Sequence, residues 1–324
     1  MVDISKGYVD EPIPEEVNNN IVAEIKKLCR EKNAVIMGHY YQPDDIQDIS
    51  DYIGDSLALA QLAQKTDADI ILVCGVHFMG ETAKILCPDK KVLVPDLNAG
   101  CSLADSCPVD KFAEFKSQHP GYTVVSYVNT TAGVKAITDI CVTSSNAKKI
   151  IDQLPLDEKI IFGPDRNLGN YINSVSGRNM LLWDGACEVH EKFSLEKILE
   201  LKKQFADAPV LAHPECRKYI LNVSDYVGST KGIINYVAHS DKSQFIIATE
   251  SGVIHEMRKQ NPDKEFIPVP PDDSSCSCNE CSYMKLTTLA KVYNALKFEQ
   301  PEILISEDIR SKAEKSILNM LKMS

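Results

Sequence analysis

The sequence has no run of about 18 apolar residues, the length that a membrane-spanning helix requires. It also has no block rich in lysine and arginine, and its formal net charge is −11. Nucleic acids and membrane surfaces bind positive patches, so we expect neither as a partner. The N-terminal stretch is polar and acidic and lacks the basic and apolar regions of a signal peptide, so we expect a cytoplasmic protein.

Cysteine, in contrast, is abundant: the chain has 11, an odd number. In a reducing compartment these residues are not expected to form disulfides. Cys29, Cys74 and Cys141 lie in or beside apolar patterns typical of helices and strands, and we interpret them as small apolar residues of the core. The remaining cysteines lie mostly in loops and require another explanation.

The stretch CSCNECSYMK holds Cys276, Cys278 and Cys281 within six positions. Taken alone, this spacing is compatible with a zinc site or an iron–sulfur cluster. A structural zinc site usually combines two short knuckles, and the sequence has no second one. The stretch therefore favours a site that draws further cysteines from elsewhere in the chain.

Short apolar runs such as AVIMGH, IILVC and KVLVP alternate with longer runs that have helical spacing, such as SLALAQLAQ. Apolar strands separated by helices are typical of parallel sheets covered on both faces. The alternation recurs over residues 30–100, 110–187 and 195–270. We therefore expect an α/β fold of three similar domains with short parallel sheets, in a pseudo-threefold arrangement around a central active site.

The expected boundaries follow from this recurrence. Residues 1–20 form an N-terminal arm and 21–108 the first domain, followed by a second domain over 109–192 and a third over 193–281. Amphipathic patterns within 282–324 predict helices that pack back and complete the first domain.

Each of the three groups ends in a loop that carries a cysteine. Cys101 and Cys187 are 86 positions apart, and Cys187 and Cys281 are 94 apart. One cysteine from each domain could reach a shared centre and hold a cluster by three thiolates, which would leave one iron open to substrate. Chance spacing is the alternative that the spacing alone leaves open.

Polar residues gather just after the predicted strands, where ligands bind in open parallel sheets. Hydroxyls at helix starts suit carboxylate or phosphate groups, whereas histidine and glutamate can move protons. A plainer role as helix cap or hydrogen-bonded scaffold is open for each residue. Such residues include His39, Tyr41, Ser56, Tyr127, Asn129, Ser144, His190, His213, Glu215, Thr230, Thr249 and Glu250.

A longer series of motifs resembles one family along nearly the whole chain. It contains GHYYQP, GDSLALA, AGCSLADSCP, SYVNTTAGVKA, WDGACEVHEKF, AHPEC, IATESGVIHEM and CNECSYMKLTTL, in this order. These motifs are similar to those of quinolinate synthase. The resemblance implies an enzyme of NAD biosynthesis, a transferase that condenses iminoaspartate with dihydroxyacetone phosphate and releases phosphate, two waters and quinolinate. L-Aspartate oxidase or aspartate dehydrogenase would supply the iminoaspartate.

The resemblance also implies an oxygen-sensitive [4Fe-4S] cluster with three cysteine ligands. Matched motif by motif, the ligands are Cys101, Cys187 and Cys281, which leaves Cys276 and Cys278 as bystanders or regulatory thiols. It further implies that His39, Tyr41, His213 and Glu215 act in catalysis. His39, His213 and Glu215 would also bind substrate, together with Ser56, Tyr127, Asn129, Ser144 and Thr230, while His190 would have a supporting or direct role and Glu250 would line the site. A structural-zinc protein and another iron–sulfur hydro-lyase are the alternative functions.

Overall fold

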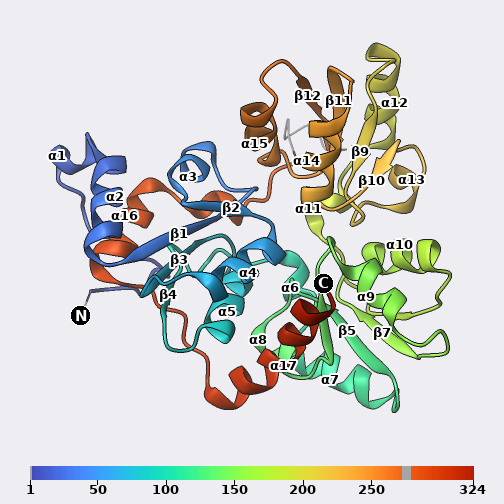
Figure 1. Ribbon diagram of the computed structural model, residues 1–324, viewed down its shortest axis with the longest axis horizontal. Helices are drawn as coiled ribbons and strands as arrows, with labels where there is room; N and C mark the ends of the chain where they lie inside the picture. The colour runs from blue at the N-terminus through green and yellow to red at the C-terminus, as the bar shows by residue number, and fades with distance from the viewer. Residues whose placement is uncertain (1, 272–278) are drawn as a thin grey trace. The chain divides into compact units, whose positions relative to one another are not determined.

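The computed structural model describes residues 2–271 and 279–324 (Figure 1). Its strands form three four-stranded sheets, and every strand pairing within them is parallel. The strand orders are β2-β1-β3-β4, β6-β5-β7-β8 and β10-β9-β11-β12. Each sheet therefore repeats one topology, which confirms the predicted fold of three similar α/β domains. No described helix is long and apolar enough to cross a membrane.

The first sheet and the helices around it come from the first hundred residues and from the C-terminal segment. Its strands are β1 (Ala34–His39), β2 (Tyr52–Gly54), β3 (Ile70–Cys74) and β4 (Lys91–Leu93). The associated helices are α1 (Glu15–Asn18), α2 (Ile21–Glu31), α3 (Asp44–Ile49), α4 (Ser56–Lys65), α5 (His77–Leu86), the 3-10 turn η1 (Met284–Leu286) and α16 (Leu289–Phe298).

The second sheet contains β5 (Thr123–Tyr127), β6 (Ile140–Val142), β7 (Ile160–Gly163) and β8 (Leu181–Leu182). The third contains β9 (Val210–Ala212), β10 (Tyr226–Val227), β11 (Gln244–Ala248) and β12 (Glu265–Pro268). The remaining helices are α6 (Ser102–Asp105), α7 (Val109–Ser117), α8 (Ala132–Ala136), α9 (Ala147–Gln153), α10 (Arg166–Ser176), α11 (Glu188–Glu191), α12 (Leu195–Gln204), α13 (Lys218–Leu221), α14 (Thr230–His239), α15 (Val253–Gln260) and α17 (Glu307–Met323).

The residues group into two compact units. The first comprises Met1–Cys101, Thr131–Ala136 and Ser282–Glu314, and the second comprises Ser102–Thr130, Ile137–Cys281 and Lys315–Ser324. The first unit holds the first sheet and the second unit holds the other two. The domain boundaries expected from the sequence stay a prediction.

Each sheet is built on apolar central strands. All five residues of β3 are buried, as the continuous apolar run predicted. Helices α2 and α16 lie side by side on the first sheet (Figure 1), where Ile25, Ile36 and Leu296 share one fully buried core. In the third sheet, Ile198 of α12 and Val210 of β9 belong to a corresponding core.

The N-terminal arm is tied to the first unit by backbone contacts. The side-chain amide of Asn294 on α16 donates hydrogen bonds to the carbonyl oxygens of Val9 (3.2 Å) and Glu11 (2.8 Å). The backbone N–H of Leu97 donates to the carbonyl of Gly7 at 2.7 Å. These contacts give the arm fixed partners although it has little regular structure.

The three sheets share one hydrogen-bond motif at the amino ends of their strands. An aspartate just before the first edge strand lies 15 positions after a residue of a central strand and exchanges two hydrogen bonds with it. Its carboxylate accepts the N–H of that residue, and its own N–H donates to the carbonyl of the same residue. The pairs are Ile36 with Asp51, Val124 with Asp139, and Val210 with Asp225. We call this pair of hydrogen bonds the aspartate clamp. It provides a common reference position from which equivalent residues of the three sheets can be counted.

Candidate functional site

The aspartate clamp shows that the predicted site residues occupy equivalent positions in the three sheets. A polar pair, two residues apart, begins three positions after each clamped central-strand residue. A hydroxyl residue follows each clamp aspartate by five positions. The pairs are His39 with Tyr41, Tyr127 with Asn129, and His213 with Glu215, and the hydroxyl residues are Ser56, Ser144 and Thr230. Nine candidates chosen from the sequence one by one are thus three copies of one three-residue pattern.

In the first unit, the pair at the end of β1 has a defined geometry. The backbone N–H of Tyr41 donates to Nδ1 of His39 at 3.1 Å, so Nε2 carries the proton of the neutral ring. The two rings meet edge to face, with 4.5 Å between centroids. His39 is buried and Tyr41 is partly exposed. The bond from Tyr41 and the edge-to-face contact therefore fix the orientation of the histidine ring.

The segment that contains this pair is held by the SYMK stretch. Lys285 donates its ammonium to the carbonyl oxygen of Tyr41 at 2.8 Å. The buried Gln42 amide contacts the sulfur of Met284 at 3.2 Å. Two motifs more than 240 positions apart in the sequence therefore form one local structure.

In the second unit, Glu215 lies at the centre of a buried polar network. Its Oε1 accepts the hydroxyl of Tyr127 at 2.6 Å, and its Oε2 lies 2.9 Å from Nδ1 of His190. The rings of His190 and His213 stack with 4.7 Å between centroids. Tyr127, Glu215 and both histidines are at least 95% buried. The network therefore joins strand ends of the second and third sheets.

The histidines extend this network in two directions. His213 accepts the backbone N–H of Glu215 at Nδ1 (3.3 Å), and its Nε2 lies 3.2 Å from the Ser144 hydroxyl. His190 places Nδ1 3.3 Å from the Cys187 sulfur and Nε2 3.1 Å from the Thr249 hydroxyl. Thr249 is one of the polar residues that follow the predicted strands, but the sequence predicted no specific role for it.

Electrostatics separates the two buried carboxyl groups of this region. Burial raises the pKa of Glu215, but the charges of His213 and His190 and the hydrogen bonds from His190 and Tyr127 outweigh burial and lower the pKa to about 2. Burial and repulsion by Glu215 raise the pKa of Asp165 well above its ordinary value. Glu215 is therefore held as a carboxylate.

The three cysteines predicted as cluster ligands also occupy equivalent positions. In each sheet, the backbone N–H of a residue that follows the third strand donates to a carbonyl two residues before the cysteine. These bonds run from His77 to Ala99 (2.6 Å), from Arg166 to Gly185 (2.8 Å) and from Ser251 to Asn279 (3.3 Å). Cys101, Cys187 and Cys281 are partly exposed, whereas the six other described cysteines are buried.

The buried cysteines behave as the sequence predicted for apolar filler. Cys29, Cys74 and Cys141 are all buried. Burial raises the pKa of Cys29 to about 11 and that of Cys107 to about 12, so these thiols stay protonated at neutral pH. Cys276 and Cys278 lie outside the described residues.

One further group of metal-ligating atoms lies in the second unit. Cys187, His190 and Glu215 each offer one such atom, and these atoms lie within 4.8 Å of one another. His190 bonds both neighbours here through Nδ1. The donor set is one thiolate, one imidazole and one carboxylate, which suits a single transition-metal ion.

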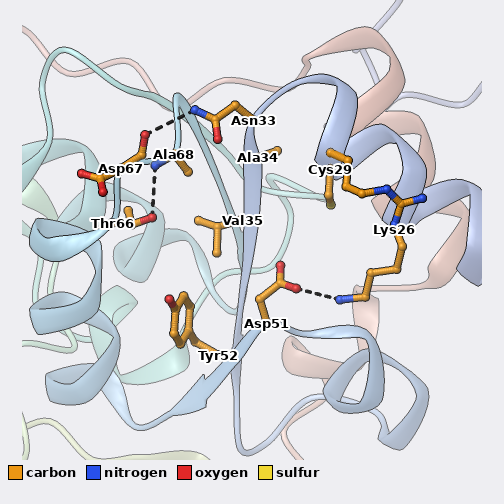
Figure 2. Close-up of a pocket in the computed structure, with 11 residues that line it drawn as sticks. Lys26, Cys29, Asn33, Ala34, Val35, Asp51, Tyr52, Thr66, Asp67 and Ala68 are labelled. Atoms are coloured by element: carbon orange, nitrogen blue, oxygen red, sulfur yellow. Dashed lines mark hydrogen bonds and ion pairs between the residues drawn. The ribbon is translucent and has the colours of Figure 1, made fainter.

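The first unit has a cavity of about 500 Å³ (Figure 2). It is lined by the start of β1, around Ala34, whereas His39 ends that strand. Lys26 and Asp51 form an ion pair at its wall, with 2.8 Å between Nζ and Oδ1. The cavity therefore lies at the amino ends of the strands and is not part of the candidate site.

Comparison with known proteins identifies the family. The family model described as quinolinate synthetase A protein matches residues 23–322. The chain belongs to this family. It is 55% identical to the quinolinate synthase of Synechocystis sp. over 313 residues, which cover 97% of this chain and 98% of that protein. It is 54% identical over 305 residues to those of Thermosynechococcus vestitus (94% and 96% covered) and Chloroherpeton thalassium (94% and 95%).

Membership of the quinolinate synthase family agrees with the resemblance found in the motifs. The match spans both compact units and all three sheets. The aspartate clamps, the polar pairs and the three partly exposed cysteines therefore all lie within the region that the family shares.

Proposed function

We propose that this protein is a cytoplasmic quinolinate synthase and a transferase of NAD biosynthesis. It condenses iminoaspartate with dihydroxyacetone phosphate and releases quinolinate, phosphate and two waters. Its iminoaspartate comes from L-aspartate oxidase or aspartate dehydrogenase. Family membership supports the activity, and the observation that carries the site is the equivalence of Cys101, Cys187 and Cys281.

These three cysteines fit an iron–sulfur cluster in their chemistry. They are the partly exposed thiols among the described cysteines, and each follows the same backbone hydrogen bond. Three thiolates are the donor set of a [4Fe-4S] cluster with one open iron. When bound, such a cluster supplies a Lewis acid that polarises a hydroxyl or ketone oxygen of the substrate.

The side chains at the strand ends have separate tasks in this proposal. Ser56 and Thr230, which begin α4 and α14, and Ser144, in the turn before α9, bind carboxylate or phosphate groups of the two anionic substrates. Tyr127 and Asn129 orient the bound acid by hydrogen bonds. Tyr127 and Thr230 are buried, which excludes water from their bonds and strengthens them.

Proton transfer is assigned to the polar pairs. His39, whose ring is oriented by the N–H of Tyr41 at Nδ1, exchanges a proton with substrate. Glu215 is held as a carboxylate by its neighbours, so in the acid/base pair with His213 it stabilises the charge that the histidine takes up when it accepts a proton. His213, bonded to Ser144, and Tyr41 complete the set of groups that exchange protons with substrate.

The proposal is tested on protein purified without oxygen. We expect about four iron and four sulfide per chain and quinolinate formation from iminoaspartate and dihydroxyacetone phosphate. Cys281→Ser should lose the iron, whereas Cys276→Ser, the matched control, should retain it. His39→Ala and Glu215→Ala should retain iron and lose product. A colourless protein with one zinc per chain would support the structural-zinc alternative, and a loaded protein that forms no quinolinate would support another hydro-lyase.

A further inference from the structure

Two buried carboxyl groups hold the backbone of two of the three equivalent cysteines. Asp165 accepts the N–H of Cys187 at Oδ2, 3.1 Å away. Glu250 accepts the N–H of Cys281 at Oε1, also 3.1 Å away. Both side chains belong to residues with no exposed surface. In both cases, a buried carboxyl group thus accepts the backbone N–H of a cysteine whose sulfur is assigned to the metal.

Asp165 and Glu250 also occupy equivalent positions. The third strands pair with the central strands through Gly163 and Ala248, and the two acids lie two residues beyond these. Arg166 and Ser251 directly follow the two acids. Their backbone N–H groups donate to the carbonyl oxygens that lie two positions before each cysteine. The first sheet has the same backbone bond, but the corresponding position is Val76, whose side chain offers no acceptor.

Each acid is fixed by a second hydrogen bond on its other oxygen. Oδ1 of Asp165 accepts the N–H of Leu168 at 2.7 Å and so caps the start of α10. Oε2 of Glu250 accepts the N–H of Gly252 at 2.7 Å. With both oxygens engaged, neither carboxyl group can rotate without losing a bond. Each side chain therefore ties a cysteine to the rigid end of a central sheet strand.

We propose that Asp165 and Glu250 are positioning residues that hold Cys187 and Cys281 in the geometry required for metal binding. The inference rests on the proposed assignment of these cysteines as ligands. Partners that orient metal ligands in this way often matter nearly as much as the ligands themselves. Cys101 lacks a carboxylate from the equivalent position, so the support differs between the three ligands.

Asp165→Ser separates the two bonds of this side chain. Serine is a good helix N-cap, so its hydroxyl can still accept the N–H of Leu168, but it is too short to serve Cys187 as well. Glu250→Gln is the second variant, because it keeps the shape and replaces one of two acceptor oxygens with a donor. Asp139→Asn is the matched control, since it replaces one acceptor oxygen with a donor in the same kind of carboxyl–amide contact, to Val124, at the amino ends of the strands.

The measurement is the rate at which anaerobic, iron-loaded protein loses iron to a chelator, beside its urea unfolding midpoint. We expect Asp165→Ser and Glu250→Gln to lose iron about 10- to 100-fold faster than wild type. Asp139→Asn should lose iron at the wild-type rate even where its midpoint falls as far. The inference is overturned if iron loss is equally accelerated in all three variants, or if no variant loses iron faster than wild type.

A second measurement reports on each cysteine separately. After removal of the metal, Cys187 should react faster with iodoacetamide in Asp165→Ser than in wild type, while the rate at Cys101 stays the same. Uniform changes at both cysteines would mean general loosening and would overturn the positioning role. Wild-type protein that binds no iron would instead refute the proposed function, and the alkylation rates would still test whether Asp165 holds Cys187.

Discussion

The bond between Tyr127 and Glu215 provides the most direct test of the buried network. Tyr127→Phe removes one hydroxyl and leaves the ring, so the packing of a residue that is 5% exposed is retained. The hydroxyl donates to Oε1 of Glu215 over 2.6 Å, a length typical of an O–H donor on a carboxylate. Hydrogen bonds to charged groups contribute about 1.5–3 kcal/mol, and we expect Tyr127→Phe to cost that much.

A double-mutant cycle isolates this contribution. Glu215→Gln keeps the shape of the side chain and removes its charge, and the double variant combines both changes. We expect a coupling free energy of about 1.5–3 kcal/mol, because each single change removes the same charge-assisted bond. Anaerobic urea unfolding followed by circular dichroism measures it, provided that the m values agree among the four proteins.

The control cycle pairs Tyr127→Phe with Glu265→Gln. Glu265 begins β12 in the same unit and its carboxylate accepts a hydrogen bond from Gln244. Distant changes add within about 0.5 kcal/mol, so this pair should show no coupling. A coupling below about 0.5 kcal/mol between Tyr127 and Glu215 would refute the network as described.

Three further predictions concern the cysteines, their loops and pH. In metal-free protein at neutral pH, iodoacetamide should modify the partly exposed Cys101, Cys187 and Cys281 before the buried Cys74 and Cys107. Mass spectrometry of peptides measures the order of modification, and modification of Cys107 first would contradict the prediction. Gly185→Ala should lower the unfolding free energy by about 1–3 kcal/mol and reduce iron content, because a Cβ at Gly185 would lie 2.6 Å from the Pro164 carbonyl oxygen. The pKa of Glu215 is lowered from 4.5 to about 2, so its carboxylate stabilises the fold above its unfolded pKa, and this stabilisation is lost as pH falls toward 2. The unfolding free energy should therefore fall less steeply from about pH 5 to pH 3 in Glu215→Gln than in wild type. Equal slopes in the two proteins would contradict the assignment.

Much of the fold could be predicted because its strands are apolar throughout. The run IILVC corresponds to β3, in which every residue is buried, and the helical pattern of SLALAQLAQK corresponds to α4. Strand pairing could not be predicted in this way. The register that aligns Asp51, Asp139 and Asp225 depends on hydrogen bonds between segments 15 residues apart, and a single aspartate before a strand has no pattern that indicates them.

The candidate site was predictable in part for a related reason. Polar residues that follow apolar strands can be read from the sequence, and this found His39, Tyr127 and His213. Asp165 lies in the loop GPDRNLG, where an aspartate is typical of a helix cap, and it does cap α10. Its second bond, to Cys187, joins residues 22 positions apart, and only the folded chain brings them together.

The three sheets repeat structural features at both ends of their strands. At the amino ends the same aspartate clamp recurs in all three, which gives each domain the same strand register. At the carboxyl ends the backbone also repeats, down to the bond that precedes each cysteine.

The side chains on that repeated backbone nevertheless differ. The first member of the polar pair is histidine, tyrosine and histidine in turn, and the residue that faces the cysteine loop is Val76, Asp165 and Glu250. Under the proposed function, the two different anionic substrates would need unlike groups at like distances. Repetition of the backbone supplies the distances, and substitution at a few equivalent positions supplies the unlike groups.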